Sequence, residues 1–378
     1  MKLAIYETVH LDWVLPYCEL FLLRNEEVYF LTNISFEKDI KETLGDRFHR
    51  FKWTFLDTEI GPFAFYKELK RFFSAQIYKG IILNSIEARH LIVAAAIRNS
   101  PMTFINVHDI NNYFKPAFAL QLRQNIRSIG KKWLHQKADG YIINAEAMKD
   151  FITKNKLSKK PVYWLPPVIE RASLMQLDEK SLFTFTIPGS IDEKRRDYQT
   201  VLEAFAQLHE LYTNQFLISL AGRPVGAYGQ MILKKVKALQ EKGIQISYSE
   251  TEIEEIAFQK LIASSSIIIS PLTRQTVIHD NIKEEYGTSK VSGNIYDAIR
   301  HGKPMIVPDY LTLPKEISSS CLKYKNKEDL LKLLIRCINE KDYINALLQQ
   351  AFYNSKQFSV TSTMNKLETL LNVIATHR

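Results

Sequence analysis

Short apolar runs recur along this chain, and longer amphipathic segments separate them. In the first half, the predicted strands are continuous apolar runs that cover residues 2–6, 28–32, 52–56, 80–84, 102–107 and 140–144. A strand without polar alternation is typical of a sheet that is buried on both faces. Segments such as IEARHLIVAAAIRN carry a helical pattern between the strands. This order predicts a parallel sheet that helices cover on both sides.

The pattern breaks across residues 155–181, where Pro161, Pro166 and Pro167 interrupt the periodicity. It then restarts, and the predicted strands of the second half cover residues 183–189, 216–222, 244–248, 266–272 and 303–308. The sequence therefore predicts an α/β protein of two consecutive doubly wound domains, 1–165 and 183–355, joined by a linker at 166–182. Ligands of such sheets bind outside the carboxyl ends of the strands, so the crevice between the two domains is the expected site.

Length and composition agree with two globular domains. The chain has 378 residues, of which 46% are hydrophobic, enough for two packed cores. A run of roughly 18 apolar residues, which a membrane-spanning helix needs, is absent from the sequence. Cys18, Cys321 and Cys337 are scattered and match no metal-binding spacing. They indicate reduced thiols, and we expect a cytoplasmic protein.

The formal charge of +9 is unevenly distributed. Residues 115–160 contain 11 Lys/Arg against 3 Asp/Glu. In LQLRQNIRSIGKKWLHQK, helical spacing places Arg123, Arg127 and Lys131 on one face. An apolar side is formed by Leu122, Ile126, Ile129, Trp133 and Leu134. The pattern favours an anionic membrane surface or a lipid-phosphate substrate, and the solvated face of an ordinary helix is the alternative. Without an aromatic-interleaved basic groove, nucleic acid is not an expected partner.

A first candidate site follows the first strand of the second domain. In IPGSIDEKRRDYQTVLEAF, Gly189 ends the strand and the next helix is expected to start near Asp197. The loop between them carries Lys194, Arg195 and Arg196. Arginine forks and a lysine charge at the mouth of a parallel sheet suit a diphosphate or triphosphate. A solvated basic loop is the alternative.

A second candidate site is the stretch EEYGTSKVSGNIYDAIRHGKPMIV, which gathers small and hydroxyl residues before a predicted helix. The N–H groups at a helix N-terminus bind anions. Ser289 and Ser292 can donate to phosphate oxygens, and Lys290 can neutralise them. Gly293 lets a backbone approach the ligand closely. Asp297, about one turn into the helix, can accept from ribose hydroxyls. The alternative is an ordinary capped helix after a flexible loop.

These blocks resemble the C-terminal half of GT-B glycosyltransferases, and most closely their large retaining family that uses nucleotide-sugar donors. The resemblance is carried by SLFTFTIPGS…KRRDYQTVLEAF, FLISLAGRP, SSIIISPL and EEYGTSKVSGNIYDAIRHGKPMIVPD, in that order. In the first half, FINVHDIN and ADGYIINAEAMKDFITKN…VYWLPPVIE are similar to segments of the same family. FSVTSTMNKLETLLNVI resembles the family's helix that crosses back to the N-terminal domain, which assigns that role to residues 356–378.

The resemblance implies residue roles, with two departures in the donor site. Ser190 stands where the family usually has an Arg, so the following three cations must supply the phosphate charge. The family's Glu-x7-Glu element matches at its second position, Asp297. Ser289 occupies the first position, and Glu285 is the expected contact to the donor sugar. Arg223, after SLAG, is a candidate for phosphate or base, and the insert adds His279 and Asp280 at the sugar pocket. A plain surface loop is the alternative for these last three.

Five residues of the first domain are candidates for the acceptor side. His108 and Asp109 follow a predicted strand and would contact the transferred sugar or the acceptor; a locally satisfied loop histidine is the alternative. Thr8, His10 and Asp12 follow the first strand and are acceptor-facing candidates, in a place where the family often has a glycine-rich loop. If the reaction retains configuration, the leaving phosphate guides the acceptor. If it inverts, His108, Asp109 or Asp12 is the candidate base.

The sequence and the resemblance together thus predict a metal-independent glycosyltransferase that uses a nucleotide diphosphate sugar, and the resemblance implies a retaining one. Asp-x-Asp is absent, so Lys, Arg and helix dipoles would stabilise the leaving group, with Lys290 in a catalytic role. No cofactor is expected. The basic N-domain favours a saccharide or lipid-linked acceptor, as in bacterial surface polysaccharide or lipopolysaccharide synthesis, at the cytoplasmic membrane's inner face. Two alternatives are a sugar-nucleotide epimerase on the same scaffold and a non-catalytic protein that binds nucleotide sugar or glycan.

Overall fold

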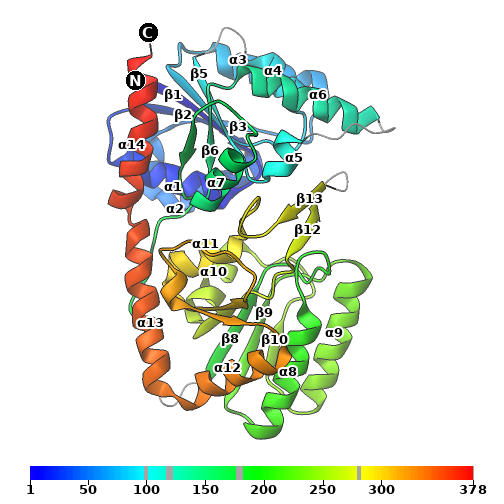
Figure 1. Cartoon of the computed structure of the whole chain (residues 1–378). Coiled ribbons are helices and arrows are strands. Elements are labelled where there is room, and N and C mark those ends of the chain that lie inside the picture. The colour runs from blue at the N-terminus through cyan, green and yellow to red at the C-terminus, as the bar shows by residue number, and fades with distance from the viewer. Residues whose placement is uncertain (98–100, 116–121, 176–181, 279–281, 378) are drawn as a thin grey trace. The chain divides into compact units, whose positions relative to one another are not determined.

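The computed structural model describes residues 1–97, 101–115, 122–175, 182–278 and 282–377. The described residues form two compact units (Figure 1). Unit 1 comprises Met1–Val168, Ile278–Glu284 and Val360–Arg378, and unit 2 comprises Ile169–Val277 and Glu285–Ser359. The chain therefore returns twice to unit 1 after it has entered unit 2.

The described part of unit 1 contains a seven-stranded parallel sheet in the order β3-β2-β1-β4-β5-β6-β7. The strands are β1 (Lys2–Glu7), β2 (Glu27–Asn33), β3 (Lys52–Leu56), β4 (Gly80–Ser85), β5 (Met102–Asn106), β6 (Gly140–Ile143) and β7 (Val162–Trp164). The strand order reverses between β1 and β4, so the carboxyl ends of these two strands border the switch point where ligands of doubly wound sheets bind.

Helices cover both faces of this sheet, as right-handed crossovers in two opposite directions require. On one face, α4 (His90–Ala96) packs against both α3 (Pro62–Ser74) and α6 (Leu122–Lys137) (Figure 1). On the other face, α1 (Leu11–Leu22) packs against the C-terminal helix α14 (Val360–Thr376). The unit also contains α2 (Glu37–Leu44), α5 (Ile110–Phe114) and α7 (Glu146–Lys154).

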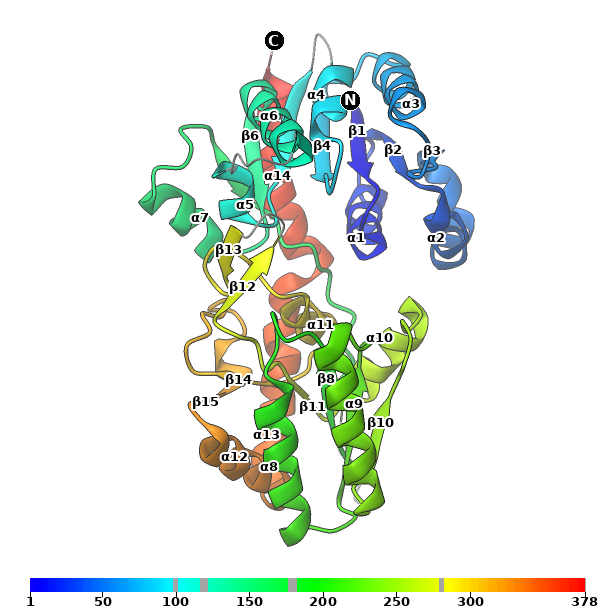
Figure 2. The ribbon, with the colours of Figure 1, turned by 90° about the vertical axis from the view of Figure 1, so that its right-hand side faces the viewer.

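Unit 2 repeats this design with a six-stranded parallel sheet among the described residues, in the order β10-β9-β8-β11-β14-β15 (Figure 2). The strands are β8 (Phe183–Pro188), β9 (Phe216–Ala221), β10 (Ile246–Tyr248), β11 (Ile267–Ile269), β14 (Met305–Pro308) and β15 (Cys321–Tyr324). The order reverses between β8 and β11. The ends of β8 and β11 are therefore the switch point of this sheet.

The helices of unit 2 pack in two groups. One group is α8 (Tyr198–Leu211), which contacts both α9 (Gly226–Glu241) and α12 (Lys327–Asn339). The other is α11 (Gly293–His301), which contacts α10 (Glu255–Ser264) and α13 (Lys341–Ser355). Each helix buries its apolar stripe; in α8, for example, Val201, Phe205 and Leu208 are fully buried.

Each strand predicted from the sequence is present, but four short strands were not predicted. β7 lies inside 155–181, which we expected to be aperiodic, and it pairs with β6 at the edge of its sheet. β15 is likewise an edge strand. β12 (Gln275–Ile278) and β13 (Ile282–Glu285) form a separate two-stranded sheet in the polar insert. Strands of three or four residues with partly exposed positions are too short to form the long continuous apolar run on which the prediction depended.

Candidate functional site

The residues singled out from the sequence divide between the two units. Thr8, His10, Asp12, His108 and Asp109 belong to unit 1, where they follow β1 and β5. The remaining described candidates belong to unit 2 and follow β8, β9 and β13 or begin α11. His279 and Asp280 lie outside the described residues.

In unit 2, one of the three predicted cations is buried beneath the end of β8. Arg196 is 7% exposed, and its guanidinium donates to the Ser190 carbonyl at 3.0 Å. It lies so close to Gly189 that a Cβ there would come within 2.2 Å of Nη2. Gly189 also has a φ of +88°, which favours glycine. Glycine is thus required at this position for two reasons: the positive φ of the turn and the space that the Arg196 guanidinium occupies.

Asn294 fixes this guanidinium to the start of α11, and the sequence analysis did not single it out. Its Oδ1 accepts from Arg196 Nη2 at 3.1 Å. Its Nδ2 lies 3.2 Å from the Pro188 carbonyl and 2.9 Å from Ser270 Oγ, so it ties β8, the end of β11 and α11 together. Ser292 is the N-cap of α11, and its Oγ accepts from the Asn294 N–H. A fixed positive charge therefore lies next to a helix N-terminus, the combination that attracts phosphate.

The other predicted cations of unit 2 are at the surface. Lys194, Arg195 and Arg223 are exposed, and Arg195 pairs with Asp192 at 3.4 Å. Of the three cations that follow Gly189, Arg196 is the one that the fold holds in place. Exposed charges on flexible stems contribute little unless a ligand orders them.

The last two residues of β13, Glu284 and Glu285, differ in exposure and in partner. Glu285 pairs with Arg274 at 2.9 Å and is partly exposed. Glu284 is 1% exposed and accepts from the Asn112 N–H at 2.7 Å within unit 1. Sequence reasoning considered only Glu285. Neighbouring glutamates on a strand point to opposite sides, so one of them can be buried while the other is exposed.

Ser289, Lys290 and the remaining α11 candidates differ in exposure. Ser289 is fully buried and its Oγ accepts from the Glu285 N–H at 2.9 Å, so it closes the turn. Lys290 and Asp297 are half-buried. Gly293 is exposed, and a Cβ there would meet no atom within 4 Å. The space in front of Gly293 is open, as the approach of a ligand to this helix start requires.

In unit 1, the loop after β5 brings His108 against the loop after β1. The His108 ring lies 4.3 Å from Trp13 and 5.8 Å from His10, measured between ring centroids. Asp12 is half-buried at the start of α1. Thr8 is buried and its hydroxyl donates to Tyr6 Oη at 3.2 Å, so it is engaged within the protein. His10 and His108 are therefore neighbours, although β4 lies between the two strands that they follow.

Glu7 is a fully buried carboxylate at the end of β1 that the sequence analysis did not single out. Its Oε1 accepts from the N–H groups of Val9 and His10, at 2.8 and 3.0 Å. Its Oε2 accepts from Asn84 Nδ2 at 2.6 Å and from Ser85 Oγ at 2.5 Å. Burial raises the pKa of this carboxyl, while His10 and the hydrogen bonds oppose the rise. The signal in the sequence was an acidic residue that ends an otherwise apolar strand.

A polar pocket of about 70 Å³ opens beside His108 and Asp109. Its other polar lining residues are His90, Asn106, Asn112, Tyr113 and Lys131. Asn106 is 6% exposed, and its Oδ1 has no partner among the described residues. One bound water needs about 10–15 Å³ of such space and a small-molecule site about 300–1,000 Å³, so the pocket can take one polar edge of a substrate but not a whole nucleotide sugar.

Lys131 belongs to this pocket and not to a surface charge row, which corrects the sequence-based prediction. It is 4% exposed, and its Nζ donates to both Asn112 O and Asn112 Oδ1 at 2.8 Å. Gly130 explains the close approach of α6, because a Cβ there would lie 2.3 Å from the backbone of Leu91. The helix is rotated so that small and polar residues face α4. Its apolar residues Leu122, Ile126, Ile129 and Trp133 are exposed instead.

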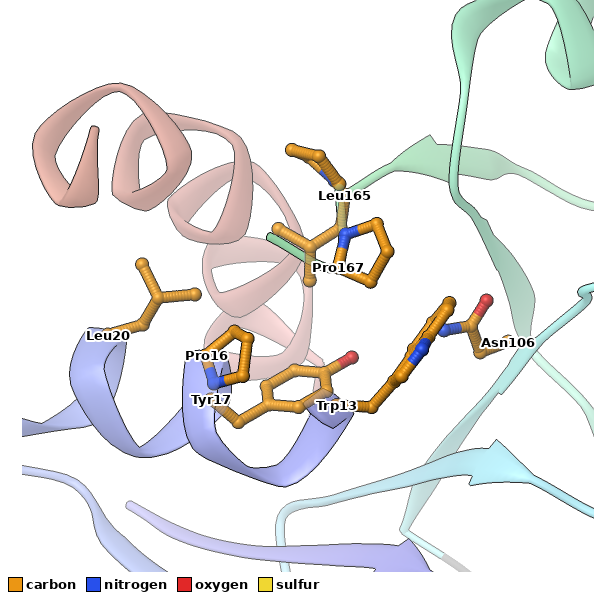
Figure 3. Close-up of a pocket in the computed structure, with 8 residues that line it drawn as sticks. Trp13, Pro16, Tyr17, Leu20, Asn106, Leu165 and Pro167 are labelled. Atoms are coloured by element: carbon orange, nitrogen blue, oxygen red, sulfur yellow. The ribbon is translucent and has the colours of Figure 1, made fainter. Parts of the chain in front are cut away.

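A second, much smaller cavity lies next to Trp13 and is mostly apolar. Trp13, Pro16, Tyr17 and Leu20 from α1 line it together with Asn106, Leu165, Pro166 and Pro167 (Figure 3). Its volume is about 10 Å³, less than a bound water needs with several polar partners. Figure 3 shows the Trp13 indole between Tyr17 and Asn106. This cavity is too small to hold a substrate.

The described residues contain neither a metal-binding cluster nor a membrane-spanning helix. Among them there is no group of three His, Cys, Asp or Glu side chains that could hold a metal ion. None of the helices they form is both long enough and apolar enough to cross a membrane.

Comparison with known proteins was informative at the level of structure. No family model and no curated protein sequence matches the chain. HepE of Anabaena, solved with UDP and glucose, is similar with a TM-score of 0.67 and 13% identity, over 98% of this chain and 99% of HepE. Sucrose-phosphate synthase from Thermosynechococcus elongatus is similar with a TM-score of 0.65 and 13% identity, over 99% of both chains.

A UDP-N-acetylglucosamine 2-epimerase is also similar, with a TM-score of 0.60 and 11% identity, over 100% of this chain and 96% of the epimerase. At these identities the likeness is one of fold. Together with the two parallel sheets and their switch points, it shows that this chain has the GT-B fold, built from two Rossmann-like domains.

Proposed function

We propose that this protein transfers a sugar from a nucleotide diphosphate sugar to an acceptor hydroxyl. The observation that carries the proposal is the buried Arg196 guanidinium, held between Gly189 and Asn294 at the start of α11. A guanidinium that protein acceptors hold in place is a fixed positive charge, and a helix N-terminus adds partial positive charge at the same place. A diphosphate leaving group needs this kind of preorganised positive environment.

The donor roles follow from position in unit 2. Arg196 and Lys290 neutralise the departing diphosphate, and the N–H groups at Ser292 and Gly293 bind its oxygens. Asp297 accepts from the ribose hydroxyls, a role that rests on the resemblance. Glu285 contacts the sugar, for which it exchanges its ion pair with Arg274. That exchange costs little, because partly exposed ion pairs contribute only about 0–1 kcal/mol.

The acceptor side belongs to unit 1. His108 and Asp109 hydrogen-bond the transferred sugar or the acceptor at the mouth of the polar pocket, with His10 and Asp12 nearby. In a retaining reaction the leaving phosphate orients the incoming hydroxyl, and no separate base is needed. In an inverting reaction, His108, Asp109 or Asp12 takes the proton. Cations and the α11 dipole stabilise the leaving group without a metal ion.

We propose a saccharide or lipid-linked acceptor of bacterial surface polysaccharide or lipopolysaccharide synthesis, reached at the inner face of the cytoplasmic membrane. The support is the outer face of α6, defined as Leu122, Ile126, Ile129 and Trp133 with the exposed cations Arg123 and Lys132. No acidic residue occurs in this helix. Apolar side chains flanked by basic ones match the interface of an anionic bilayer.

A sugar-nucleotide epimerase is the second candidate, because an epimerase is among the structures of similar fold. The two reactions differ in their need for an acceptor. A transferase releases nucleotide diphosphate faster when an acceptor is added, whereas an epimerase changes the sugar's configuration and keeps it attached to the nucleotide. A protein that binds the nucleotide sugar but turns nothing over would be a non-catalytic binding protein.

The test is to incubate the full chain with UDP, GDP and ADP sugars, with and without saccharide acceptors and with and without a chelator. We expect acceptor-dependent release of one nucleotide diphosphate, at the same rate in the chelator. Lys290→Ala should lower this rate by on the order of 10²-fold, the effect of losing one preorganised charge stabiliser. Lys194→Ala, which removes an exposed cation of unit 2, is the matched control.

A further inference from the structure

The buried charge of Glu7 cannot be explained by packing alone. Its carboxylate is 0% exposed, and none of the ion pairs among the described residues includes it. A charged group in such a place is disfavoured unless hydrogen bonds hold it, and here four donors do so. A glutamine of the same shape would fill the same space without the cost of a buried charge. The acceptor-only character of the carboxylate is therefore the property to explain.

The carboxylate determines which way the Ser85 hydroxyl donates. An ionised carboxylate only accepts, so at 2.5 Å the single Ser85 proton is directed to Glu7 Oε2. The Ser85 oxygen also lies 3.0 Å from His108 Nε2. Since its proton is committed to Glu7, this oxygen can only accept from His108. Glu7 thus makes Ser85 an acceptor towards the imidazole.

A second acceptor confirms which nitrogen of His108 carries the proton. His108 Nε2 lies 2.9 Å from the Asn84 carbonyl oxygen, which cannot donate. Both neighbours of Nε2 are therefore acceptors, and Nε2 is protonated in the neutral ring. Nδ1 then carries the lone pair, consistent with the Asn144 Nδ2 donor 3.5 Å away. The tautomer follows from the partners.

We propose that Glu7 is a positioning residue that, through Ser85, holds His108 with Nε2 protonated and Nδ1 as the acceptor nitrogen for a substrate hydroxyl. Trp13 packs against the His108 ring, so the tilt of the imidazole is restricted as well. Glu7 Oε1 also fixes the N–H groups of Val9 and His10, which places the loop after β1 beside His108. One carboxylate thereby organises both loops of the acceptor side. This inference rests on the proposed function for the role of His108, but the tautomer itself does not.

Glu7→Gln is the sharpest variant, because it keeps the shape and replaces one acceptor by a donor. The amide would donate to Ser85, whose proton would then be available to His108 Nε2. The experiment is 15N NMR of the full chain labelled at its nine histidines, with the His108 signals assigned by their loss in His108→Gln. We expect a single Nε2–H tautomer in the wild type and a mixture in Glu7→Gln. In steady-state kinetics, kcat should fall by roughly tenfold to a hundredfold, at the lower end of positioned acid–base effects, with nucleotide affinity unchanged.

Ser85→Ala separates positioning from a general structural role. If Glu7 acts through Ser85, adding Glu7→Gln to Ser85→Ala produces no further change in tautomer or kcat. If Glu7 only supports the loop after β1, Glu7→Gln changes the tautomer and kcat equally in the wild type and in Ser85→Ala, and the proposal is overturned. A wild-type tautomer in Glu7→Gln overturns it too. Should Glu7→Gln fail to fold, Ser85→Ala alone must lower kcat and broaden the His108 signals; unchanged values reject the proposal.

Failure of the proposed function has a different signature. If the wild type turns over no nucleotide sugar, the transferase proposal fails, while the NMR experiment still decides whether Glu7 controls the His108 ring, because it needs no substrate. If turnover is normal but the tautomer does not respond to Glu7→Gln, the transferase proposal stands and the positioning role is rejected.

Discussion

At the scale of single residues, two glycines of unit 2 have opposite surroundings. A Cβ on Gly222 would lie 2.1 Å from the Gly189 carbonyl oxygen and 2.3 Å from its carbon, and this backbone cannot move without shifting the end of β8. A Cβ on Gly293 would meet no atom within 4 Å. The first glycine is required by the fold, whereas the second faces open space where we place the phosphates.

Gly222→Ala should therefore lower the free energy of unfolding by about 1–3 kcal/mol, the usual cost of overpacking. Gly293→Ala should leave it unchanged or slightly raised, because Ala is a better helix former than Gly. The same Gly293 variant should weaken nucleotide diphosphate binding. Urea unfolding and calorimetric titration with nucleotide diphosphates measure the two quantities. A Gly293→Ala protein that binds nucleotide like the wild type would remove this helix start from the donor site.

Lys303 is a buried lysine next to α11, and it makes stability depend on pH. It is 5% exposed, its Nζ contacts Met175 Sδ at 2.9 Å, and burial lowers the pKa of its ammonium from 10.5 to about 8. Between these two pKa values the unfolded chain binds the proton and the folded chain does not, so this group makes stability rise with pH. Below pH 8 both states are protonated, and the full cost of burying the charge is present.

Lys303→Met should therefore be more stable than the wild type at pH 7, by up to about 3 kcal/mol. The difference should shrink as the pH rises from 8 to 10.5, because the wild-type lysine becomes neutral in the folded state. Urea unfolding at pH 7, 8, 9 and 10 measures the gap between the two proteins. Comparing them at each pH cancels the tyrosines that also titrate at the upper end. A difference in the free energy of unfolding that stays constant across this pH range would contradict the lowered pKa of Lys303.

At the scale of elements, α6 connects the pocket to the surface. Its inner face places Lys131 in the polar pocket, and Gly130 lets it approach α4 closely. Its outer face exposes 43% of Ile126 and 50% of Ile129. Packing thus reverses what the amphipathic pattern suggests, because an apolar stripe of a water-soluble helix normally faces the core. An exposed apolar row with basic neighbours marks an interaction surface.

The double variant Ile126→Ser, Ile129→Ser should keep the wild-type thermal midpoint, because both side chains are already exposed. It should bind vesicles that contain anionic lipid at least about tenfold more weakly, since inserting one apolar side chain contributes about 1.5–3 kcal/mol. Co-sedimentation with anionic and with neutral vesicles measures the affinity. Leu211→Ser, at a 62% exposed position on α8, is the matched control and should bind like the wild type. Equal binding by the double variant would remove α6 from the membrane contact.

At the scale of the whole molecule, the proposal divides the reaction between the two units. The donor phosphates are assigned to unit 2 through Arg196, and the acceptor side to unit 1 through His108. Substitutions in the two units should therefore have different kinetic consequences. Substitutions at the donor site of unit 2 should weaken nucleotide binding, whereas substitutions on the acceptor side of unit 1 should slow transfer alone.

His108→Gln should lower kcat for transfer by roughly 10²-fold or more and leave the affinity for the nucleotide diphosphate unchanged. Arg196→Lys should weaken that affinity, because a lysine cannot reproduce the planar fork held by Ser190 and Asn294. Calorimetry and steady-state kinetics on the same preparations distinguish the two patterns. Lys194→Ala, at an exposed cation in the same loop as Arg196, should match the wild type in both. If His108→Gln and Arg196→Lys lose nucleotide affinity equally, the division of donor and acceptor roles between the two units is wrong.

The sequence by itself determined the architecture, because the long apolar strands and their helices are local patterns. Continuous runs such as KLAIY and GIILN, with helical segments between them, are typical of a parallel sheet covered by helices on both faces. The edge strands β7 and β15 were missed because partial burial leaves little pattern in three or four residues. The sequence also placed the candidate cations and His108 after the ends of predicted strands, where ligands of such sheets bind, and their roles stay predictions.

Only the tertiary structure decided which of these side chains are buried and what they contact. Arg196 differs from Lys194 and Arg195 because the fold places Gly189 and Asn294 around it. Lys131 is removed from the surface because Gly130 lets α6 approach α4. Glu7 acquires its importance from Ser85, which is 78 residues away along the chain. Burial and hydrogen-bond partners depend on contacts between distant segments, and periodicity along the chain carries no information about them.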